Sequence, residues 1–526
     1  MKTPRKKILL NGMMGSGKST VGRLLKEVLG WRFVDTDAEI EKRAGKPISR
    51  IFAEEGEPAF RKLELKEARR LAGCFNCVVA TGGGMFTQPE ALQVLAENSL
   101  VVHLAARPET LARRLAAAED RPLLENVQKR ERLEEIYKKR QKIYESLPVQ
   151  IDTENRSPEQ VVQAILRRFF SGQEPELIFD RLGEVYSGLN SFEHLPVLIR
   201  KMTPVRKIAV LADDVLWPLV KKDFERLFEE EWERLPLVIP AGEGYKSPEQ
   251  AESLWTQLKD FGADRYTPFI AIGGGVVGDL GGFVAATYMR GIPLIQIPTT
   301  LLGQVDSGLG GKTAINYQGV KNLIGSFYHA ALTLLDPLFL LTLPKAEVQS
   351  GLSEMLKAGI LAEPELVDFM EANASELQQG HLPALEWAVG RAARVKLQIV
   401  AEDPRERKGK RIFLNLGHTF AHAIESVSAY GIRHGEAVAI GLILAAKLGE
   451  SLGKTEPGLS QKLQAILLRL GLPTEPPAGK TEEMLQVMQS DKKKKGKRIQ
   501  FVIPVKIGEP RVVELEDLGI VRKILE

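Results

Sequence analysis

Two stretches of the sequence carry residue types whose spacing suits chemistry, and they suit different reactions. Residues 12–20 read Gly-Met-Met-Gly-Ser-Gly-Lys-Ser-Thr, a glycine-rich loop typical of nucleotide phosphate binding. Residues 415–425 and 433–437 contain three of the seven histidines of the chain, together with glutamates, and this density indicates a metal site. The first stretch needs a nucleoside triphosphate and the second a divalent cation with an oxygen-rich substrate. The spacing therefore predicts two enzymes on one chain.

The composition is that of an ordinary globular protein. With 526 residues the chain exceeds what one hydrophobic core usually supports, which predicts two or three domains. The formal net charge of +4 is too small to indicate nucleic-acid binding, and no apolar run reaches the length of a membrane span. We therefore expect a cytoplasmic protein that binds small molecules, with no nucleic-acid or membrane partner. Cys74 and Cys77 form a lone Cys-x-x-Cys that leads into an apolar strand, so we expect buried structural cysteines.

Alternating apolar runs and charged amphipathic stretches predict an α/β fold. In residues 1–170 the runs at 8–10, 78–80 and 100–104 predict buried parallel strands, so we expect a P-loop kinase domain with a doubly wound parallel sheet. Residues 171–176 have the composition of a linker.

The periodicity changes in the rest of the chain. Four apolar runs between residues 207 and 297 predict a Rossmann-like α/β domain over 177–338. Long helical patterns then predict a mostly α-helical, metal-binding domain over 339–526.

The glycine-rich loop follows an apolar strand at 7–10 and precedes a helical pattern, which is the context of a nucleotide loop. Its backbone N–H groups would face the phosphates, Lys18 would neutralise their charge and Ser19 would hold Mg²⁺. Asp35 and Asp37 end a second predicted strand beside this loop, although Asp37 could also be a helix cap. The loop alone leaves the phosphoryl acceptor open.

Taken together, the motifs of residues 7–170 resemble the shikimate kinase family. The glycine-rich loop, 35–37, 60–64, 81–84, 121–124 and 137–144 follow in that family's order. The resemblance implies ATP and Mg²⁺ as cofactors and shikimate as the acceptor, with Arg121 on a lid over the phosphates. It assigns ATP binding to Gly15, Ser16, Gly17, Lys18, Ser19, Thr20, Arg114, Arg121 and Arg156. It assigns shikimate binding to Asp37, Arg61, Gly83 and Arg140, magnesium to Ser19 and Asp35, and catalysis to Lys18, Asp37 and Arg121.

The histidines are spaced for metal binding. His418 and His422 are four residues apart in a helical pattern and therefore share a face, and His434 follows. Zinc sites with an open position use three protein ligands, often two histidines and a glutamate. Spacing does not select the glutamate, since three qualify: Glu354, Glu425 and Glu436.

A literal Gly-x-Gly-x-x-Gly at 273–278 follows the apolar run 269–272. The acidic residue expected about twenty positions later for the ribose is missing, since residues 280–298 contain no Asp or Glu. The segment is therefore either a dinucleotide loop of another design or a tight turn. Asp213 or Asp214 could take the ribose role instead.

Across residues 177–526 these fragments resemble the 3-dehydroquinate synthase family. The shared motifs lie at 242–246, 273–279, 298–302, 306–316, 321–322, 353–357, 415–419 and 434–436. The resemblance implies conversion of 3-deoxy-D-arabino-heptulosonate 7-phosphate to 3-dehydroquinate and phosphate, with NAD that is recycled and a zinc or cobalt ion. Gly303 and Gly308 replace the family's usual alanine and serine, which we expect to loosen a loop without removing a ligand.

The same resemblance implies residue roles. It places the metal on Glu354, His418 and His434, and catalysis on Lys312, Lys357 and His422. It assigns NAD to Asp213, Glu243, Lys246, Gly274, Gly275, Val276, Asp279, Thr299, Thr300, Lys312 and Lys321. It assigns the substrate to Asp306, Lys312, Asn322, Lys357, Lys396, Arg411, Asn415, His422 and Arg290, with Lys492 or Lys493 as a further phosphate contact. Arg290 is implied to reach the neighbouring subunit's substrate, which predicts a homodimer through the synthase half.

The resemblances together imply a bifunctional enzyme of the shikimate pathway. The two reactions are not consecutive there, so channelling between the sites is not expected. A second interpretation keeps the folds but joins another small-metabolite P-loop kinase to a metal-dependent polyol dehydrogenase or a related sugar-phosphate cyclase. A third is a nucleotide-responsive regulatory protein, against which the intact Lys18, Asp37 and histidines argue.

Overall fold

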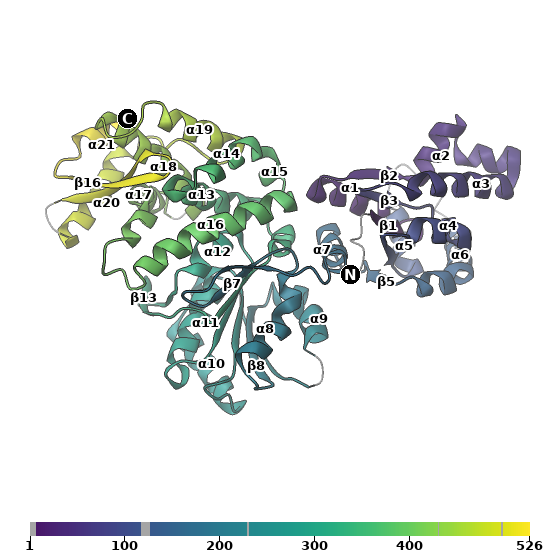
Figure 1. The fold of residues 1–526 in the computed structure, drawn as a ribbon, viewed down its shortest axis with the longest axis horizontal. Coiled ribbons are helices and arrows are strands. Elements are labelled where there is room, and N and C mark those ends of the chain that lie inside the picture. The colour runs from purple at the N-terminus through teal and green to yellow at the C-terminus, as the bar shows by residue number, and fades with distance from the viewer. Residues whose placement is uncertain (1–6, 117–126, 229–230, 430, 496–497) are drawn as a thin grey trace. The chain divides into compact units, whose positions relative to one another are not determined.

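The computed structural model describes residues 7–116, 127–228, 231–429, 431–495 and 498–526, and only the backbone of residues 127–132 and 491–495. Its contacts divide the chain into two compact units, Met1–Ser171 and Gly172–Glu526. Strands and helices alternate through the first unit and through the first part of the second, whereas helices dominate the remainder (Figure 1).

The first unit is built on a five-stranded sheet in the order β2-β3-β1-β4-β5, and all its neighbouring strands are parallel. Side chains from alternate strand positions, such as Leu9, Val79 and Val101, form one core with the helices that follow β2 and β3. Because the strands are parallel, their carboxyl ends meet at one edge of the sheet. The elements are β1 (Lys7–Asn11), α1 (Lys18–Leu29), β2 (Arg32–Asp35), α2 (Thr36–Ala44), α3 (Ile48–Ala72), β3 (Cys77–Ala80), α4 (Pro89–Ala96), β4 (Ser99–Ala105), α5 (Pro108–Ala116), α6 (Val127–Ser146), β5 (Val149–Asp152) and α7 (Pro158–Phe169).

The second unit begins with a seven-stranded sheet in the order β6-β7-β14-β11-β10-β8-β9, in which only β6 and β7 pair antiparallel. Successive residues of β8 face two different cores, Ile208 and Val210 toward one and Ala209 and Leu211 toward the other. The sheet is therefore covered on both faces. The elements are β6 (Glu176–Phe179), β7 (Glu184–Ser187), α8 (Leu195–Met202), β8 (Lys207–Asp213), α9 (Trp217–Leu227), β9 (Glu233–Ile239), α10 (Pro248–Asp260), β10 (Phe269–Gly273), α11 (Gly275–Thr287), β11 (Leu294–Pro298), α12 (Leu301–Val305), β12 (Lys312–Tyr317), β13 (Val320–Phe327) and β14 (Leu332–Leu335).

The rest of the second unit is mostly helical. Its helices share one large apolar core, in which α13 and α18 are buried along nearly their whole length. The elements are α13 (Lys345–Ala362), α14 (Pro364–Ala372), α15 (Ala374–Gln378), α16 (Leu382–Glu402), α17 (His418–Val427), α18 (His434–Ser451), α19 (Leu459–Arg469), α20 (Thr481–Lys495), β15 (Ile499–Lys506), β16 (Glu509–Leu515) and α21 (Gly519–Leu525). The predicted α/β class, with a helical region after the second sheet, is confirmed.

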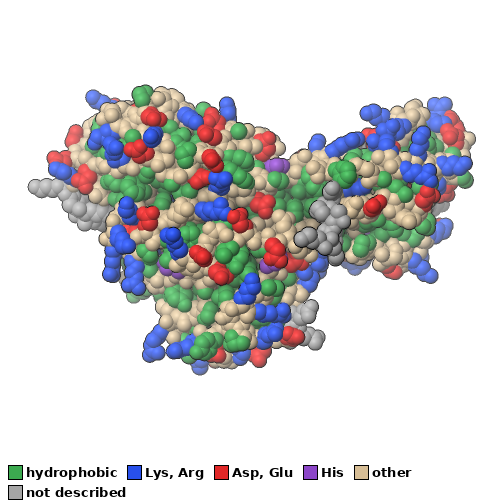
Figure 2. All heavy atoms as spheres, viewed as in Figure 1, with side chains coloured by type: hydrophobic (Ala, Val, Ile, Leu, Met, Phe, Trp, Pro, Cys, Tyr) green, Lys and Arg blue, Asp and Glu red, His purple; other side chains and the backbone are tan. Residues whose placement is uncertain are grey.

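Cys77 is fully buried in β3, as predicted, whereas Cys74 is only partly buried beside it. Burial raises the pKa of the Cys77 thiol to about 12, so this thiol is not reactive at neutral pH. Among the described residues, no helix combines the length and the apolar character needed to span a bilayer. Acidic and basic side chains are interspersed on the face shown in Figure 2.

Candidate active sites

The glycine-rich loop of the first unit connects β1 to α1 and curls around the start of that helix. Gly15 and Gly17 have φ angles of 83° and 93°, a left-handed conformation that residues with a Cβ rarely adopt. The Lys18 ammonium donates to the carbonyls of Gly12 and Met13, at 2.8 and 3.0 Å. This geometry places a helix N-terminus and a lysine charge at the same spot, which suits a bound phosphate chain.

A cavity of about 1000 Å³ opens on this loop. It is lined by every described residue that the sequence assigns to ATP, namely Gly15, Ser16, Gly17, Lys18, Ser19, Thr20, Arg114 and Arg156. Arg114 is held at its wall by hydrogen bonds to the hydroxyl and the carbonyl of Thr153, at 3.0 and 2.6 Å. Arg121, the predicted lid residue, lies outside the described residues.

The two residues predicted to bind magnesium touch each other. The Ser19 hydroxyl donates to one Asp35 oxygen at 3.0 Å, and the other oxygen accepts the Asp37 backbone N–H at 3.1 Å. Asp35 is therefore the N-cap of α2, and the suggestion that Asp37 could be a cap is wrong. Asp37 itself lines the cavity.

A second group of side chains gathers at the turn after β3. A Cβ placed on Gly84 would lie 2.6 Å from Arg61 Nη1 and 3.0 Å from Arg140 Nη2, so both guanidinium groups rest against this turn. A Cβ on Gly82 would lie 2.5 Å from an Asp37 oxygen. The structure thus brings Asp37, Arg61 and Arg140 together around the Gly82–Gly84 turn, next to the phosphate loop. Two cations and one carboxylate can bind and orient a hydroxylated acid.

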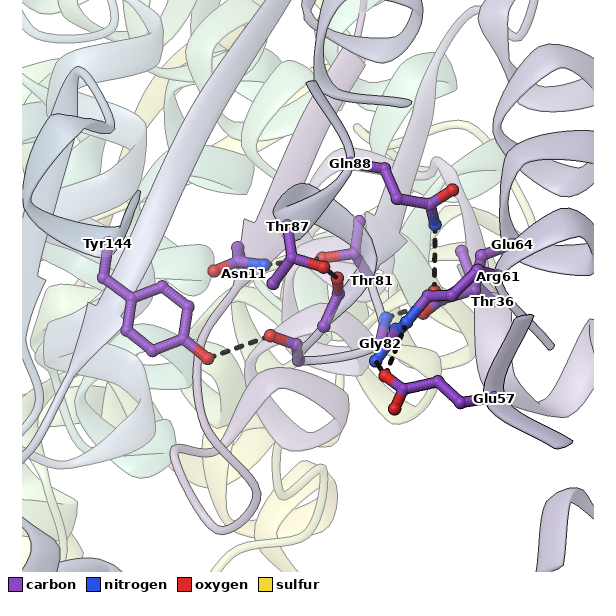
Figure 3. A network of polar contacts seen from close by, with 12 residues as sticks. Asn11, Thr36, Glu57, Arg61, Glu64, Thr81, Gly82, Thr87, Gln88 and Tyr144 are labelled. Atoms are coloured by element: carbon purple, nitrogen blue, oxygen red, sulfur yellow. Dashed lines mark hydrogen bonds and ion pairs between the residues drawn. The ribbon is translucent and has the colours of Figure 1, made fainter. Parts of the chain in front are cut away.

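Figure 3 shows two side chains that support this turn and that the sequence analysis left without a role. Glu64 is 1% exposed, accepts Arg61 Nη1 at 2.6 Å and accepts the Gln88 amide at 3.2 Å. The Tyr144 hydroxyl donates to the Gly83 carbonyl at 2.9 Å, and its ring stacks on His103 with centroids 4.4 Å apart. The ion pair of Arg61 and Glu64 could have been predicted from their three-residue spacing on a helix. Nothing in the sequence predicts the contact between Tyr144 and His103.

In the second unit, the glycine segment at 273–278 ends β10 and begins α11. Gly274 and Gly275 line a narrow pocket with Asp279 and Lys312. Asp213 ends the neighbouring strand β8, where its carboxylate accepts the N–H groups of Val215 and Leu216. Thr299 and Thr300 follow β11, the neighbour on the other side. The segment is therefore a strand-to-helix loop at a sheet edge, the context of a dinucleotide site.

Lys246 connects this loop to the β12–β13 hairpin. Its ammonium donates to the Asp279 carboxylate and to the side-chain amide oxygen of Asn322, both at 2.5 Å. Burial raises the pKa of Asp279. Glu243 accepts the side-chain amide of Asn316 at 2.9 Å. Val276 is half-buried on α11 and Lys321 is exposed on β13, and among the described residues neither lines the narrow pocket.

Gly303 and Gly308 approach each other closely. A Cβ on Gly308 would lie 2.7 Å from the Gly303 carbonyl oxygen, and one on Gly303 would lie 2.9 Å from Pro298 Cβ. The expectation that these glycines loosen the loop is wrong, because they allow tight packing against Pro298.

Glu354, His418 and His434 form the one metal-type cluster found among the described residues, with donor atoms all within 4.8 Å of one another. Glu354 is 1% exposed in α13, and the histidines begin α17 and α18. Each imidazole turns Nε2 toward Glu354 Oε1, at 3.5 Å for His418 and 3.3 Å for His434. His418 Nδ1 lies 3.2 Å from the Leu416 carbonyl. His434 Nδ1 lies 3.1 Å from a Glu425 oxygen. Partners on Nδ1 that leave Nε2 for an ion are typical of metal-binding histidines.

This geometry separates the three candidate glutamates. Glu354 belongs to the cluster, Glu425 orients His434, and Glu436 accepts the Arg433 backbone N–H in the first turn of α18. Burial lowers the pKa of His418 to about 3, so its ring is neutral as a ligand must be. Burial opposes a charge on His434, but hydrogen bonds with Glu354 and Glu425 outweigh it and raise its pKa to about 10. The carboxylates thus favour positive charge here, which a divalent cation supplies.

Ionic side chains surround the cluster. Lys396 Nζ lies 2.5 Å from an Asp306 oxygen, and Lys357 Nζ lies 3.6 Å from the same oxygen and contacts Glu354. Burial lowers the pKa of Lys396, whereas Glu354 and Asp306 outweigh burial and raise the pKa of Lys357. The His422 ring lies 5.6 Å from that of His418, beside the cluster but not in it.

Arg411 extends this group. A Cβ on Gly310 would lie 3.3 Å from Arg411 Nη2 and 3.8 Å from Lys396 Cε, so both cations flank Gly310. Asp403 fixes the loop before Arg411 by accepting four backbone N–H groups, those of Arg407, Lys408, Lys410 and Arg411. Lys312 pairs with Glu406 of that loop at 2.6 Å. Asn415 is exposed just before α17, and Arg290 is exposed in a turn with a φ angle of 66°. The side chains of Lys492 and Lys493 lie outside the described residues.

The fold and the two sites define a P-loop kinase unit followed by a dinucleotide-type α/β domain with a helical, metal-binding partner domain. Residues 14–169 match the sequence model of the shikimate kinase family. Residues 236–350 and 351–494 match those of the 3-dehydroquinate synthase N-terminal and C-terminal regions.

The curated relatives are 3-dehydroquinate synthases, the family that residues 236–494 match. The 3-dehydroquinate synthase of Citrifermentans bemidjiense is 40% identical over 347 residues, which cover 66% of this chain and 96% of that protein. That of Neisseria meningitidis serogroup C is 41% identical over 323 residues, covering 61% of this chain and 90% of that protein. A solved 2-epi-5-epi-valiolone synthase of Streptomyces hygroscopicus, with NAD⁺ and Zn²⁺ bound, is 27% identical with a TM-score of 0.58, covering 65% of this chain and 94% of that one. The chain belongs to the 3-dehydroquinate synthase family and carries a shikimate kinase domain ahead of it. Both domains are enzymatic.

Proposed function

We propose that this chain catalyses two reactions in separate halves. Residues 1–170 transfer a phosphoryl group from ATP to shikimate. After a linker at 171–176, an NAD-binding domain at 177–338 and a helical domain at 339–526 convert 3-deoxy-D-arabino-heptulosonate 7-phosphate to 3-dehydroquinate and phosphate. The proposal includes a cytoplasmic location, which rests on the metabolic class of both domains.

The observation that carries the kinase assignment is the convergence of Asp37, Arg61 and Arg140 beside the phosphate loop. The arginines bind the substrate's carboxylate, and Asp37 orients the acceptor hydroxyl and takes its proton. Lys18 stabilises the charge on the transferred phosphoryl group, and Ser19 and Asp35 would hold the magnesium ion.

The observation that carries the synthase assignment is the cluster of Glu354, His418 and His434. These three residues fit a zinc or cobalt ion because two imidazole nitrogens and one carboxylate converge and leave further positions open, and the ion would replace the proton on His434. When bound, such an ion polarises a substrate hydroxyl, and NAD supplies reversible hydride transfer. The glycines at 273–275, Asp213, Lys246 and Asp279 would hold the dinucleotide.

The remaining residues of the synthase site bind and orient an anionic substrate. Lys357, Lys396 and Arg411 share this group with three carboxylates, and their donors suit a carboxylate and a phosphate of the substrate. Lys312 and Asn322 hold the phosphate group that leaves the substrate. His422 orients this same phosphate, which takes the substrate proton that is lost in the elimination.

The proposal includes a homodimer through the synthase half. The β12–β13 hairpin exposes Leu323 at 57%, Val320 at 50% and Phe327 at 43%. A gathering of large apolar side chains on a two-stranded sheet is costly in water and typical of an interface. Arg290 is exposed in a left-handed turn and would reach a neighbouring subunit's substrate.

The first experiment measures phosphate release from the heptulosonate phosphate with NAD⁺, with and without chelator. We expect chelator-sensitive release without accumulation of NADH. Release accompanied by stoichiometric NADH would instead favour a polyol dehydrogenase, and no release from zinc-loaded protein would refute the synthase assignment. ADP formation that depends on shikimate tests the kinase half in the same preparation.

A further inference from the structure

Arg61, the proposed carboxylate-binding residue of the kinase site, is already paired with two carboxylates. Glu64 accepts Nη1 at 2.6 Å, and Glu57 accepts both Nε and Nη2, at 3.1 and 2.7 Å. Figure 3 shows the two glutamates on either side of the guanidinium group. Both Glu57 contacts go to one carboxylate oxygen, Oε1, so a single oxygen of Glu57 occupies the Nε and Nη2 donors of the guanidinium group.

The two glutamates differ in their surroundings. The Glu64 side chain is 1% exposed and also accepts the Gln88 amide, so it is a fixed part of the site. The Glu57 side chain is 63% exposed and makes its polar contacts within the described part of the chain with Arg61. The hydrogen bond with Arg61 lowers the pKa of Glu57, and the nearby charge of Arg140 adds to this effect. Glu57 is therefore an ionised carboxylate that responds to both arginines of the acceptor site.

The backbone next to Glu57 is not continuous helix. Gly56 interrupts α3 with φ 77° and ψ 172°, and Pro58 follows two residues later. Glu57 lies at the junction of two helical segments, so its side chain can move without unwinding the segment that carries Arg61 and Glu64.

We propose that Glu57 is a specificity-determining residue of the kinase acceptor site, a resident carboxylate that competes with the substrate's carboxylate for Arg61. This inference rests on the proposed function, since it takes Arg61 as a ligand of the shikimate carboxylate. An incoming carboxylate must either displace Glu57 or share one positive charge with two carboxylates, and both weaken its binding. An acceptor without a carboxylate cannot displace Glu57 at all. Glu57 thus restricts the site to anionic acceptors and limits its affinity for them.

The test is the Glu57→Gln variant of the full chain, which keeps the shape of the side chain and removes its charge. We expect the KM for shikimate to fall about two- to five-fold, as for loss of one exposed competing charge, with kcat nearly unchanged. Benzoate, a simple carboxylate, should also inhibit the variant at lower concentration. The matched control is Glu54→Gln on the same helix, because Glu54 pairs with Lys46 and Arg50 rather than with Arg61. Its KM should equal that of the parent chain.

An unchanged or higher KM in Glu57→Gln would overturn the inference, since Glu57 would then only position Arg61. Glu57→Ala provides a second variant if the glutamine side chain prevents folding, and the same fall in KM is expected. The proposed function fails in a different way. If the parent chain forms no ADP with shikimate, or if Arg61→Met leaves the KM for shikimate unchanged, the assignment of Arg61 is wrong before Glu57 is considered.

Discussion

Glu425 should control how tightly the synthase half holds its metal ion, although it is not a ligand. Its carboxylate lies 3.1 Å from His434 Nδ1, and its side chain is 16% exposed. This contact fixes the ring so that Nε2 faces Glu354 and increases the basicity of that nitrogen. Removing such a partner typically costs about 10- to 100-fold in metal affinity, or about 1.4 to 2.8 kcal/mol.

Two variants separate orientation from charge. Glu425→Ala removes both the hydrogen bond and the charge, so we expect the full loss of about 10- to 100-fold in Zn²⁺ affinity. Glu425→Gln keeps an oxygen that accepts a hydrogen bond and should lose less. The matched control is Glu436→Gln, because Glu436 accepts a backbone N–H in the first turn of α18, the helix that begins at His434, and holds no histidine nitrogen.

The assay is competition for Zn²⁺ against a chromophoric chelator, followed by phosphate release at each free zinc concentration. Activity of Glu425→Ala should return to the parent value at saturating zinc, since the ligands themselves remain. Zinc affinity within two-fold of the parent chain would refute the reasoning that Glu425 supports His434. A defect that saturating zinc does not restore would mean that Glu425 acts on the substrate instead.

Four further predictions concern other residues of the two sites. Lys18→Ala should lower the kinase rate by about 100-fold or more while phosphate release by the other half is unchanged, measured in one preparation. His422→Ala should sharply reduce phosphate release without reducing zinc content, and intact elimination would refute its role. Burial lowers the pKa of His103 from 6.5 to about 4. Between these two pH values the unfolded chain binds a proton that the folded chain does not, so the stability of the fold decreases as the pH falls from 6.5 to about 4. This lowering of the pKa corresponds to about 3 kcal/mol of stability at neutral pH. His103→Phe keeps a ring against Tyr144 and should remove this pH dependence from the thermal unfolding of the kinase unit, which is the transition that ATP should shift. Leu323→Glu should yield monomers in light scattering and reduce synthase but not kinase activity, and an unchanged dimer would exclude the hairpin as the interface.

Several features of this protein could be predicted from sequence because they are set by residues close together in the chain. The phosphate loop depends on glycines that adopt left-handed angles within one strand-to-helix turn, and the pattern of residues 12–20 records that requirement directly. The alternation of apolar runs likewise predicted two α/β sheets, because parallel strands buried on both faces need uninterrupted apolar residues. A metal site could be proposed because three of the seven histidines fall within one short segment, residues 418–434.

Other features depended on contacts between distant segments, which spacing cannot reveal. Three glutamates qualified as the metal ligand, and only the packing of α18 against both α13 and α17 places Glu354 with the two histidines. The N-cap of α2 is a local exception, because the pattern allowed more than one aspartate and the structure shows Asp35 accepting the Asp37 N–H. The stack of Tyr144 on His103 joins residues from α6 and β4 that no local pattern connects.

The sequence by itself therefore determined which chemistries are present, since loops and helix termini that bind phosphate or metal are built from neighbouring residues. The tertiary structure decided which side chains complete each site and which restrain them. Glu57 illustrates the difference, because its position four residues before Arg61 indicates a helical ion pair, an ordinary surface feature. Only the fold turns Arg61 toward the Gly82–Gly84 turn and Arg140, where we propose that Glu57 competes with a substrate carboxylate.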